Sequence, residues 1–379
     1  MREPGRTAIG TWSGGRYLRF GETIDEERLE ALLRPAEGIA TLLTADTYGQ
    51  GGADELLGRA LAGAPRDSYS LVGAVGHDIY EGERDGPRGF PRFTDSRLRG
   101  EDGYADYLRM AAERSLGRLG VSSFDLLLLH NPDRIGYSSE AVWDAMAALR
   151  EEGLAGQIGV APGPANGFTL DLIACFERFG DRIDWAMVIL NPFEPWPGEL
   201  CLEAAATREI KVITRVVDYG GLFWGDIAPG MELAKGDHRA FRPEGWIETG
   251  LEKLDRVLPI AERARLTPIQ LACQWNLAHP AVECVVPTLI QEAHPEACPI
   301  EAKRVELAAL PADQRLSEED VAEIRAIGDN TGCMALKGAS PRHEGEERPD
   351  RWALSKELTA VGGRWGIDPE RDLAEVSPT

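Results

Sequence analysis

The chain has 379 residues, of which 43% are hydrophobic and 27% charged, as is usual for a globular protein. Its formal net charge of −22 repels phosphate backbones, which makes nucleic acid a poor partner. No apolar run approaches the roughly 20 residues of a membrane span, and the N-terminal MREPGRTAIG has no hydrophobic core of a secretory signal. We therefore expect a cytoplasmic protein that acts on a small molecule, of an oligomeric state that composition leaves open.

Eight short apolar runs alternate with longer amphipathic stretches along the chain. Several of these runs, such as DLLLLH and WAMVIL, are almost entirely apolar, which is typical of parallel strands covered on both faces. The predicted strands are Thr7–Trp12, Ala40–Thr44, Tyr69–Val75, Asp125–His130, Gln157–Val160, Trp185–Leu190, Lys211–Val216 and Val282–Val286.

Helical periodicity fills the intervals between these runs. The predicted helices are Asp25–Leu33, Ala53–Ala62, Tyr104–Leu119, Glu140–Glu152, Thr169–Arg178, Glu199–Thr207, Glu252–Arg265, Pro268–His279 and Ser317–Ile327. This alternation predicts the α/β class and a (β/α)8 TIM-type barrel over residues 1–328. A doubly wound sheet would need a G-x-G-x-x-G turn after the first strand, and TWSGGRYLRFG does not supply one in register.

Residues 329–379 form a predicted C-terminal extension. The segment is rich in glycine, proline and charge, as flexible segments are. It nevertheless carries large apolar side chains, which predict that it packs on the barrel and could cover the mouth as a lid. These side chains are Met334, Leu336, Trp352, Leu354 and Trp365.

The cysteines and histidines do not form a recognisable metal-binding or disulfide pattern. No C-x-x-C pair occurs among the six cysteines, and no H-E-x-x-H spacing occurs among the six histidines. We therefore expect reduced thiols and no metal site.

Four segments at predicted strand ends resemble the aldo-keto reductases. TADTYGQGGADELLGRAL (44–61) is similar to D-T-A-x-x-Y-G-x-G-x-S-E-x-x-L-G-x-A-L, and DLLLLHNPD (125–133) to L-L-H-x-P-D. ALREEGLAGQIGVA (148–161) is similar to L-x-x-x-G-K-I-R-x-I-G-V-S-N, and QLACQWNLAHPAVECVVP (270–287) to A-L-x-W-x-L-x-x-P-x-V-x-x-x-I-P. The four segments occur in the family's order, and the resemblance covers about residues 7–310.

The resemblance implies a catalytic site that is only partly retained. In the family a tyrosine protonates a carbonyl oxygen while nicotinamide delivers hydride, a Lys–Asp pair lowers the tyrosine pKa, and a histidine orients the carbonyl. By this resemblance Tyr48 fills the tyrosine position and His130 the histidine position. Leu43 stands at the aspartate position and Ala74 at the lysine position. Joint loss of the pair is coherent, since the loss of one partner would leave a buried charge unpaired.

The positions that contact the cofactor in the family also differ here. The Ser-Asn after strand 5 is Ala161-Pro162, and the glutamine near the end of strand 6 is Met187. Lys303 and Arg304 either meet a phosphate or lie on a solvated helix face. The resemblance implies NADP(H) at much reduced affinity, with a reaction that uses no cofactor as the alternative. The residues expected to line the cofactor are Arg215, Pro287, Thr288, Arg304 and Glu306.

His77 could take over part of the lost acid–base chemistry. It directly follows strand 3, near the space that the family's lysine would occupy. A histidine titrates near neutrality, so His77, Tyr48 and His130 could form an acid–base cluster. The alternative is that His77 and Asp78 form an exposed pair on a loop.

Four other residues at strand ends are candidates for substrate binding. Trp12 would form a pocket wall, although most tryptophans belong to the core. Asn191, near Glu194, would hydrogen-bond a polar substrate, unless it only shapes a proline-rich loop. Arg215 and Asp218 flank the end of strand 7, where a structural ion pair is favoured over an anchor for a substrate anion.

The sequence leaves three functions open, each of which involves a small polar carbonyl or hydroxyl compound. The first is an NADP(H)-linked oxidoreductase with a non-standard active site. The second is a redox-neutral lyase, dehydratase or isomerase on the same fold, which the loss of Lys, Asp and nicotinamide contacts favours. The third is a binding protein without catalysis, against which the retained Tyr48 and His130 argue.

Overall fold

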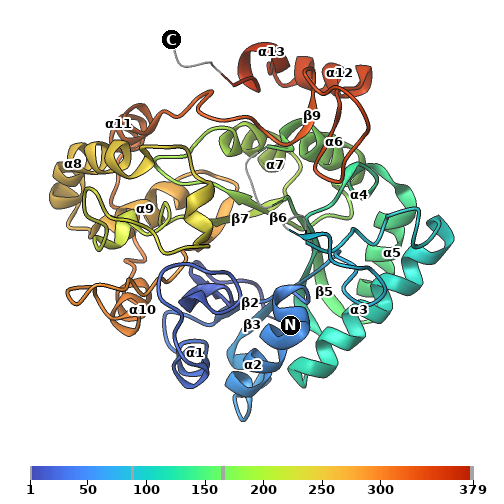
Figure 1. The fold of residues 1–379 in the computed structure, drawn as a ribbon, viewed down its shortest axis with the longest axis horizontal. Helices are drawn as coiled ribbons and strands as arrows, with labels where there is room; N and C mark the ends of the chain where they lie inside the picture. The colour runs from blue at the N-terminus through green and yellow to red at the C-terminus, as the bar shows by residue number, and fades with distance from the viewer. Residues whose placement is uncertain (1, 87–88, 164–166, 376–379) are drawn as a thin grey trace.

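Eight parallel strands form one sheet that closes into a barrel. The computed structural model describes residues 2–86, 89–163 and 167–375. Strands pair in chain order, and a parallel bridge between Thr7 and Val285 joins the last strand to the first (Figure 1). The strands are β1 Ala8–Gly10, β2 Thr41–Leu43, β3 Ser70–Val75, β4 Phe124–His130, β5 Ala155–Ala161, β6 Trp185–Ile189, β7 Lys211–Arg215 and β8 Val282–Val286. The predicted (β/α)8 barrel is therefore confirmed, with every predicted strand in place.

The interior of the barrel is packed with apolar side chains from alternate positions of the strands. On β4, Leu126 and Leu128 face this interior, whereas Leu127 and Leu129 face the helices. Every residue of β3 and β4 is buried, which explains the continuous apolar runs in the sequence. The interior cluster comprises Ala8, Trp12, Leu43, Ala45, Val72, Ala74, Leu126, Leu128, Ala161, Trp185, Met187, Ile213, Cys284 and Val286.

Helices surround the sheet and cover its outer face (Figure 1). Those of the barrel are α1 Glu26–Leu32, α2 Gly52–Leu61, α3 Tyr104–Leu119, α4 Arg134–Ser138, α5 Glu140–Glu151, α6 Thr169–Phe179, α7 Leu202–Thr207, α8 Trp246–Ala264, α9 Pro268–Leu277, α10 Ile300–Ala308 and α11 Glu318–Gly328. The prediction placed the start of α8 six residues too late, at Glu252. Buried Trp246, Ile247 and Gly250 extend its apolar face towards the N-terminus. Over the described residues, no helix is both long and apolar enough to cross a bilayer.

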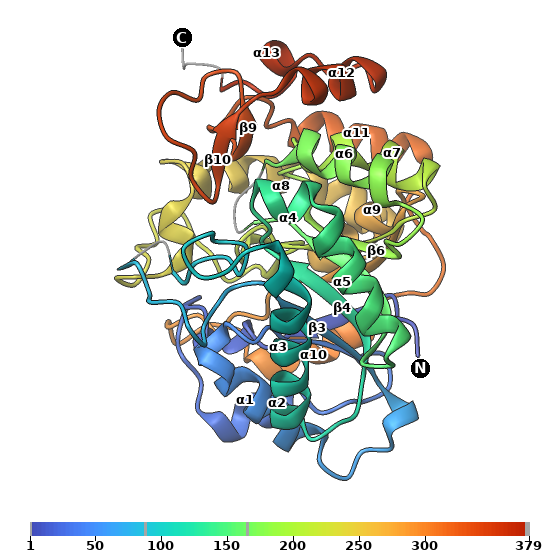
Figure 2. The same ribbon diagram turned by 90° about the vertical axis from the view of Figure 1, so that its right-hand side faces the viewer.

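The segment after residue 328 packs on the outside of the barrel over α6 (Figure 2). Its elements are a two-stranded parallel sheet of β9 Gly338–Ser340 and β10 Arg351–Ala353, followed by α12 Lys356–Arg364 and α13 Pro369–Asp372. Trp352 is 1% exposed, and its indole Nε1 donates a hydrogen bond of 2.8 Å to Oδ1 of Asp171 on α6. Phe168, which precedes α6, donates its main-chain N–H to the oxygen of Lys337 at 2.9 Å. The large apolar side chains of the extension therefore serve packing.

Candidate active site

Tyr48 and His130 meet at the C-terminal rim of the barrel, where barrel enzymes hold their active sites. Tyr48 begins a tight 3-10 turn after β2, and His130 is the last residue of β4. Their rings lie edge to face with centroids 5.8 Å apart. The turn requires glycine at Gly49, because its φ is +59° and a Cβ there would lie 2.8 Å from the ring of Tyr17. The tyrosine and histidine positions implied by the resemblance are therefore neighbours in space.

Both groups are electrically neutral at neutral pH. Burial raises the pKa of Tyr48, and nearby Arg215 only partly offsets that effect. Burial, together with the charges of Arg92 and Arg215, lowers the pKa of His130 to about 3. Tyr48 is consequently a hydrogen-bond donor, and His130 is an imidazole able to accept a proton. The Nδ1 atom of His130 is buried and lacks a hydrogen-bond partner among the described residues.

His77 lies beside His130, with ring centroids 5.3 Å apart, but it is committed to structural contacts. Its Nδ1 lies 3.1 Å from the oxygen of Phe90 and 3.0 Å from Nη1 of Arg92, and its Nε2 lies 2.9 Å from Nδ2 of Asn131. Burial and the charge of Arg92 hold the pKa of His77 well below its usual value. His77 is therefore a neutral ring that positions its neighbours, and the predicted acid–base role has no support in this geometry.

The expected His77–Asp78 pair does not form. Asp78 is fully buried, accepts hydrogen bonds from the main-chain N–H groups of Tyr80 and Glu81, and pairs with Arg99 at 2.5 Å. His77 is only 8% exposed, so an exposed pair on a loop is also wrong.

Trp12 forms one wall of the site. It is 7% exposed, and its ring meets that of Tyr48 edge to face with centroids 6.1 Å apart. Its indole Nε1 donates to Oγ1 of Thr288 at 3.3 Å. The prediction that Trp12 borders the substrate stays a prediction, and its contact with Tyr48 is consistent with it.

Asn191 and Asp218 are turned away from the rim and hold loops. Asn191 is fully buried, and its amide bonds Oε2 of Glu194, the oxygen of Val216 and the N–H of Phe193. The expectation that it contacts substrate is not met, because none of its surface is exposed. The predicted Arg215–Asp218 ion pair is also absent. Asp218 accepts instead from the main-chain N–H of Thr288 at 2.7 Å.

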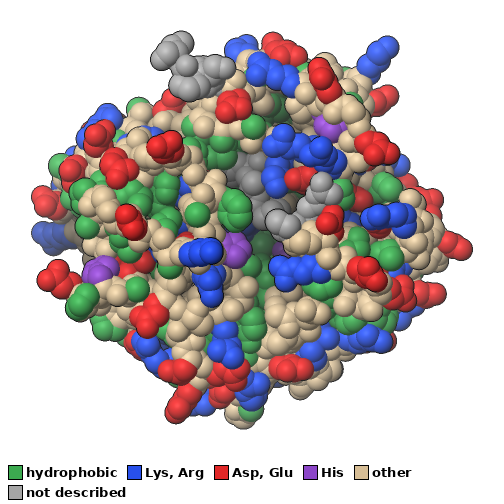
Figure 3. Space-filling model, viewed as in Figure 1, with side chains coloured by type: hydrophobic (Ala, Val, Ile, Leu, Met, Phe, Trp, Pro, Cys, Tyr) green, Lys and Arg blue, Asp and Glu red, His purple; other side chains and the backbone are tan. Residues whose placement is uncertain are grey.

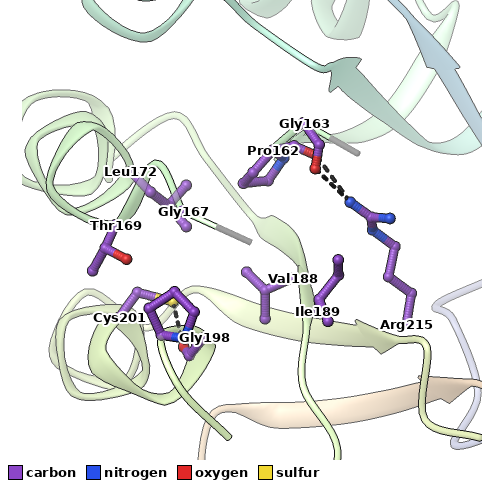
Figure 4. Close-up of a pocket in the computed structure, with 11 residues that line it drawn as sticks. Pro162, Gly163, Gly167, Thr169, Leu172, Val188, Ile189, Gly198, Cys201 and Arg215 are labelled. Atoms are coloured by element: carbon purple, nitrogen blue, oxygen red, sulfur yellow. Dashed lines mark hydrogen bonds between the residues drawn. The ribbon is translucent and has the colours of Figure 1, made fainter. Parts of the chain in front are cut away.

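Arg215 reaches across the barrel rim from β7 to the end of β5 (Figure 4). Its Nη2 donates to the oxygens of Gly163 at 2.7 Å and Pro162 at 3.2 Å. Its Nε is buried and has no hydrogen-bond partner among the described residues. The cavity behind it, lined also by Val188, holds about 20 Å³, enough for about one water molecule. A ligand of Arg215 would therefore approach from the side of Tyr48 and His130.

Two further residues at this rim had no signal in the sequence pattern. Arg92 lies in the long loop after β3, is 8% exposed, and donates Nε to the main-chain oxygen of Asn131. Asn131 has a φ of +49°, a left-handed conformation that asparagine tolerates better than most residues. Only their position after strand C-termini could have suggested a role. Figure 3 shows this face of the molecule hollowed near its centre, with basic and histidine side chains at the edge of the hollow.

An eight-stranded α/β barrel with a tyrosine and a histidine facing each other at its C-terminal rim is the architecture of a barrel enzyme. The family model described as Aldo/keto reductase family matches residues 7–328. The chain therefore belongs to the aldo/keto reductase family. Membership implies an NAD(P)H-dependent oxidoreductase.

Relatives and solved structures agree with this family. A 6-dehydroglucose reductase of Agrobacterium fabrum is 31% identical over 161 residues, which span 42% of this chain and 50% of that protein. A probable aldo-keto reductase 1 of Glycine max is 26% identical over 319 residues, 80% of each chain. The glycerol dehydrogenase of Gluconobacter oxydans superposes with a TM-score of 0.65 at 22% identity, covering 86% of this chain and 92% of its own. An aldo-keto reductase from Bacillus halodurans in its holo form gives 0.62 at 21% identity, with coverages of 86% and 96%.

The residues that the resemblance assigns to the family's Lys–Asp positions, Leu43 and Ala74, are apolar and buried. Leu43 is 2% exposed and Ala74 6% exposed, and both belong to the apolar interior cluster. Met187 and Ala161 belong to the same cluster, so the expected polar contacts to a carboxamide are replaced by hydrocarbon. Hydrocarbon therefore lies next to Tyr48 on this side, and the positive charge that acts on its pKa comes from Arg215, whose effect burial outweighs.

The loop after β8 is already bonded to the protein itself. The N–H of Thr288 donates to Oδ1 of Asp218, and the N–H of Leu289 donates to Oγ of Ser13 at 3.2 Å. The oxygen of Thr288 accepts from Nε1 of Trp224 at 2.9 Å. A carboxylate thus occupies a main-chain donor of this loop, and Thr288 and its neighbour Pro287 are buried.

The predicted cofactor contacts on α10 are also engaged elsewhere. Lys303 is 1% exposed, which corrects the expectation of a solvated face. It pairs with Asp226 and donates to the oxygen of Ile290 at 2.6 Å. Arg304 donates to the oxygens of Leu32 and Arg34 at the end of α1, and Glu306 accepts from Gln270 at its main-chain oxygen. The described residues therefore do not fit a nicotinamide dinucleotide in the way the family binds it.

Proposed function

We propose that this chain is an enzyme that acts on a small polar carbonyl or hydroxyl compound by proton transfer, without a nicotinamide cofactor. The reaction class is that of a lyase, dehydratase or isomerase. The observation that carries this proposal is the hydrogen bond from the N–H of Thr288 to Asp218, which closes the loop after β8 against a dinucleotide phosphate. The apolar residues Leu43 and Ala74 support it, because they remove the groups that serve hydride transfer.

The chemistry of the site suits proton transfer at a carbon next to a carbonyl group. The phenol of Tyr48, kept protonated by burial, donates a hydrogen bond to the carbonyl oxygen and stabilises the charge that develops there. His130 accepts the proton from the adjacent carbon through its neutral imidazole, which is a weak base while burial and the charges of Arg92 and Arg215 hold its pKa down. Return of that proton from His130 to a neighbouring carbon gives isomerisation. Transfer of the same proton to a hydroxyl group on the next carbon, whose C–O bond then breaks with release of water, gives dehydration.

Calorimetric titration tests the cofactor half of the proposal. Purified protein is titrated with NADPH, NADP+, NADH and NAD+ up to millimolar concentration, with an aldo-keto reductase from Klebsiella pneumoniae, whose structure holds NADPH, as the positive control. We expect no heat of binding from this chain. Tight binding of any of the four dinucleotides overturns the proposal.

Isotope exchange tests the proton-transfer half. A panel of hydroxy ketones, aldoses and sugar acids is incubated with the enzyme in D2O and followed by proton NMR. We expect loss of the signal from a C–H next to a carbonyl in at least one compound, abolished in His130→Gln and slowed in Tyr48→Phe. Exchange that persists in both variants contradicts the assigned roles.

An NADP(H)-linked oxidoreductase is the second candidate function. Family membership favours it, as do relatives whose names are those of a reductase and a dehydrogenase. Under this alternative Tyr48 and His130 would hold the carbonyl for hydride transfer. The same calorimetric titration decides between the two, since only this function requires a dinucleotide to bind.

A further inference from the structure

Buried cations in the described chain differ in how their charge is balanced. Three arginine or lysine side chains are classed as buried there: Arg92, Arg239 and Lys303. Arg239 pairs with Asp237 at 2.7 Å and also with Glu292, and Lys303 pairs with Asp226. Such pairing is the rule, because a buried charge without a counter-charge is strongly destabilising.

Arg92 has no carboxylate within ion-pair distance among the described residues. Its guanidinium contacts the main-chain oxygens of Asn131 and Phe90 and the ring of His77. Asp133 and Asp350 act on it only electrostatically, from beyond that distance.

Arg215 likewise has no carboxylate within ion-pair distance among the described residues. It donates to the oxygens of Pro162 and Gly163, whereas its buried Nε is unpartnered among the described residues. Glu194, the nearest acidic influence on it, is paired with Arg242 at 3.2 Å. The chain has 63 acidic and 41 basic residues. Even so, the guanidinium groups of Arg92 and Arg215 have no carboxylate within ion-pair distance in the described part of the chain.

The two guanidiniums flank His130. Arg92 contacts His77, whose ring lies against His130, and Arg215 lies near Tyr48, whose ring lies on another side of His130. After burial, the positive charges of Arg92 and Arg215 also lower the pKa of His130. The titratable and charged groups around His130 are therefore Tyr48 from the turn after β2, His77 and Arg92 from the loop after β3, and Arg215 from β7.

We propose that Arg92 and Arg215 bind an oxyanion, a carboxylate or phosphate carried by the substrate, beside His130. Arginine presents its donors in a planar fork that matches the oxygens of either group. The anion supplies the counter-charge that the chain omits, and the reacting carbon is then held between His130 and Tyr48. The inference rests on the proposed function for its catalytic meaning, whereas binding of the anion itself needs only the two arginines.

Anion binding would also activate the base. With the site empty, burial and the two cations disfavour the protonated form of His130. An oxyanion on Arg92 and Arg215 cancels their field, so His130 accepts a proton more readily when substrate is present. This arrangement restricts proton abstraction to anionic substrates.

Calorimetry with small oxyanions tests the inference directly. The wild-type protein is titrated with oxalate and with inorganic phosphate, using sodium chloride at matched ionic strength as the reference. Arg92→Gln and Arg215→Gln remove one charge each, and Arg97→Gln is the matched control because that side chain is 83% exposed. We expect saturable binding of at least one anion to wild type and Arg97→Gln, weakened by about tenfold or more in the two test variants. The anion that binds tells a carboxylate substrate from a phosphate.

A second measurement on wild-type protein covers the case in which the variants fail to fold. The ring signals of His130 are followed by NMR against pH with and without the anion, and the pKa is expected to rise when the anion is present. No anion binding by the wild type, unchanged affinity in both folded variants, or a pKa of His130 indifferent to the anion overturns the inference. Dinucleotide binding overturns the proposed function alone, so the two failures are distinguishable.

Discussion

Restoring the Lys–Asp pair that the family uses tests whether Leu43 and Ala74 replaced it as a unit. Leu43 pairs in register with Val72 of β3, and Ala74 lies two residues further along β3 on the same interior face. At 2% and 6% exposure, a single Leu43→Asp or Ala74→Lys substitution leaves an uncompensated charge in hydrocarbon. Each single substitution should lower the free energy of unfolding by about 3–5 kcal/mol.

The double substitution should cost less than the sum of its parts. If the two charges meet, their coupling recovers about 1–3 kcal/mol of the roughly 6–10 kcal/mol that additive costs would remove. Urea unfolding of wild type, both single variants and the double variant yields this coupling, provided that the m value is unchanged. The neutral pair Leu43→Asn and Ala74→Met is the matched control and should show no coupling of this size.

Two results would refute this reasoning. If the losses of unfolding free energy in the two single variants simply add in the double variant, the side chains at positions 43 and 74 do not interact. The Lys–Asp pair would then not have been replaced as a unit. If the double variant bound NADPH, the missing Lys–Asp pair alone would explain why the wild-type protein does not bind the cofactor. We expect no recovery, because Asp218 still occupies the N–H of Thr288.

Three further outcomes follow from the contacts of Tyr48 and Asp171. Tyr48→Phe should slow turnover of the true substrate by about 10²–10⁴-fold while changing the free energy of unfolding by less than about 0.5 kcal/mol. An equal loss of stability would contradict its catalytic role. Trp352→Phe removes the 2.8 Å hydrogen bond to Asp171 and should cost about 1–3 kcal/mol in urea unfolding, unlike an exposed control such as Phe241→Leu. Burial raises the pKa of Asp171 to about 6, so the proton that stabilises the folded chain is fully present below pH ~4 and is lost as pH rises through 6. Asp171→Asn should remove this fall of stability, and a pH profile identical to that of wild type would sink the assignment.

The barrel could be predicted from the sequence because strands that are buried on both faces consist almost entirely of apolar residues. Continuous apolar runs mark strands such as β4 and β6, and their ends coincide with the predicted ends to within two residues. Helix α8 was placed late because Gly250 interrupts its apolar pattern, although it is buried against Tyr219 and Leu222. The short helices α4 and α10 escaped prediction, since neither has an extended amphipathic pattern.

The site was predictable only where strand ends determine it. Tyr48 and His130 could be brought together because the C-termini of parallel strands meet at one rim. The partners of His77 and Asp218 depend on how distant loops fold back onto the rim. Local sequence does not specify that Arg92 contacts His77 or that Thr288 contacts Asp218. Arg92 itself stands in a long loop whose periodicity carries no signal.

Two features of the site are connected by electrostatics. One is the apolar residue at the lysine position assigned by the resemblance, and the other is the pair of arginines without a carboxylate partner among the described residues. In the family a lysine next to the tyrosine supplies the positive charge of the site. Here the charge lies instead at Arg92 and Arg215, on the side of His130, whereas the position below Tyr48 is apolar. Cations there disfavour a protonated histidine and favour a bound anion. Under the proposal, His130 therefore removes a proton only when a bound anionic substrate cancels the field of the two arginines. A site built for hydride delivery has no need of that arrangement, because its acid is the tyrosine.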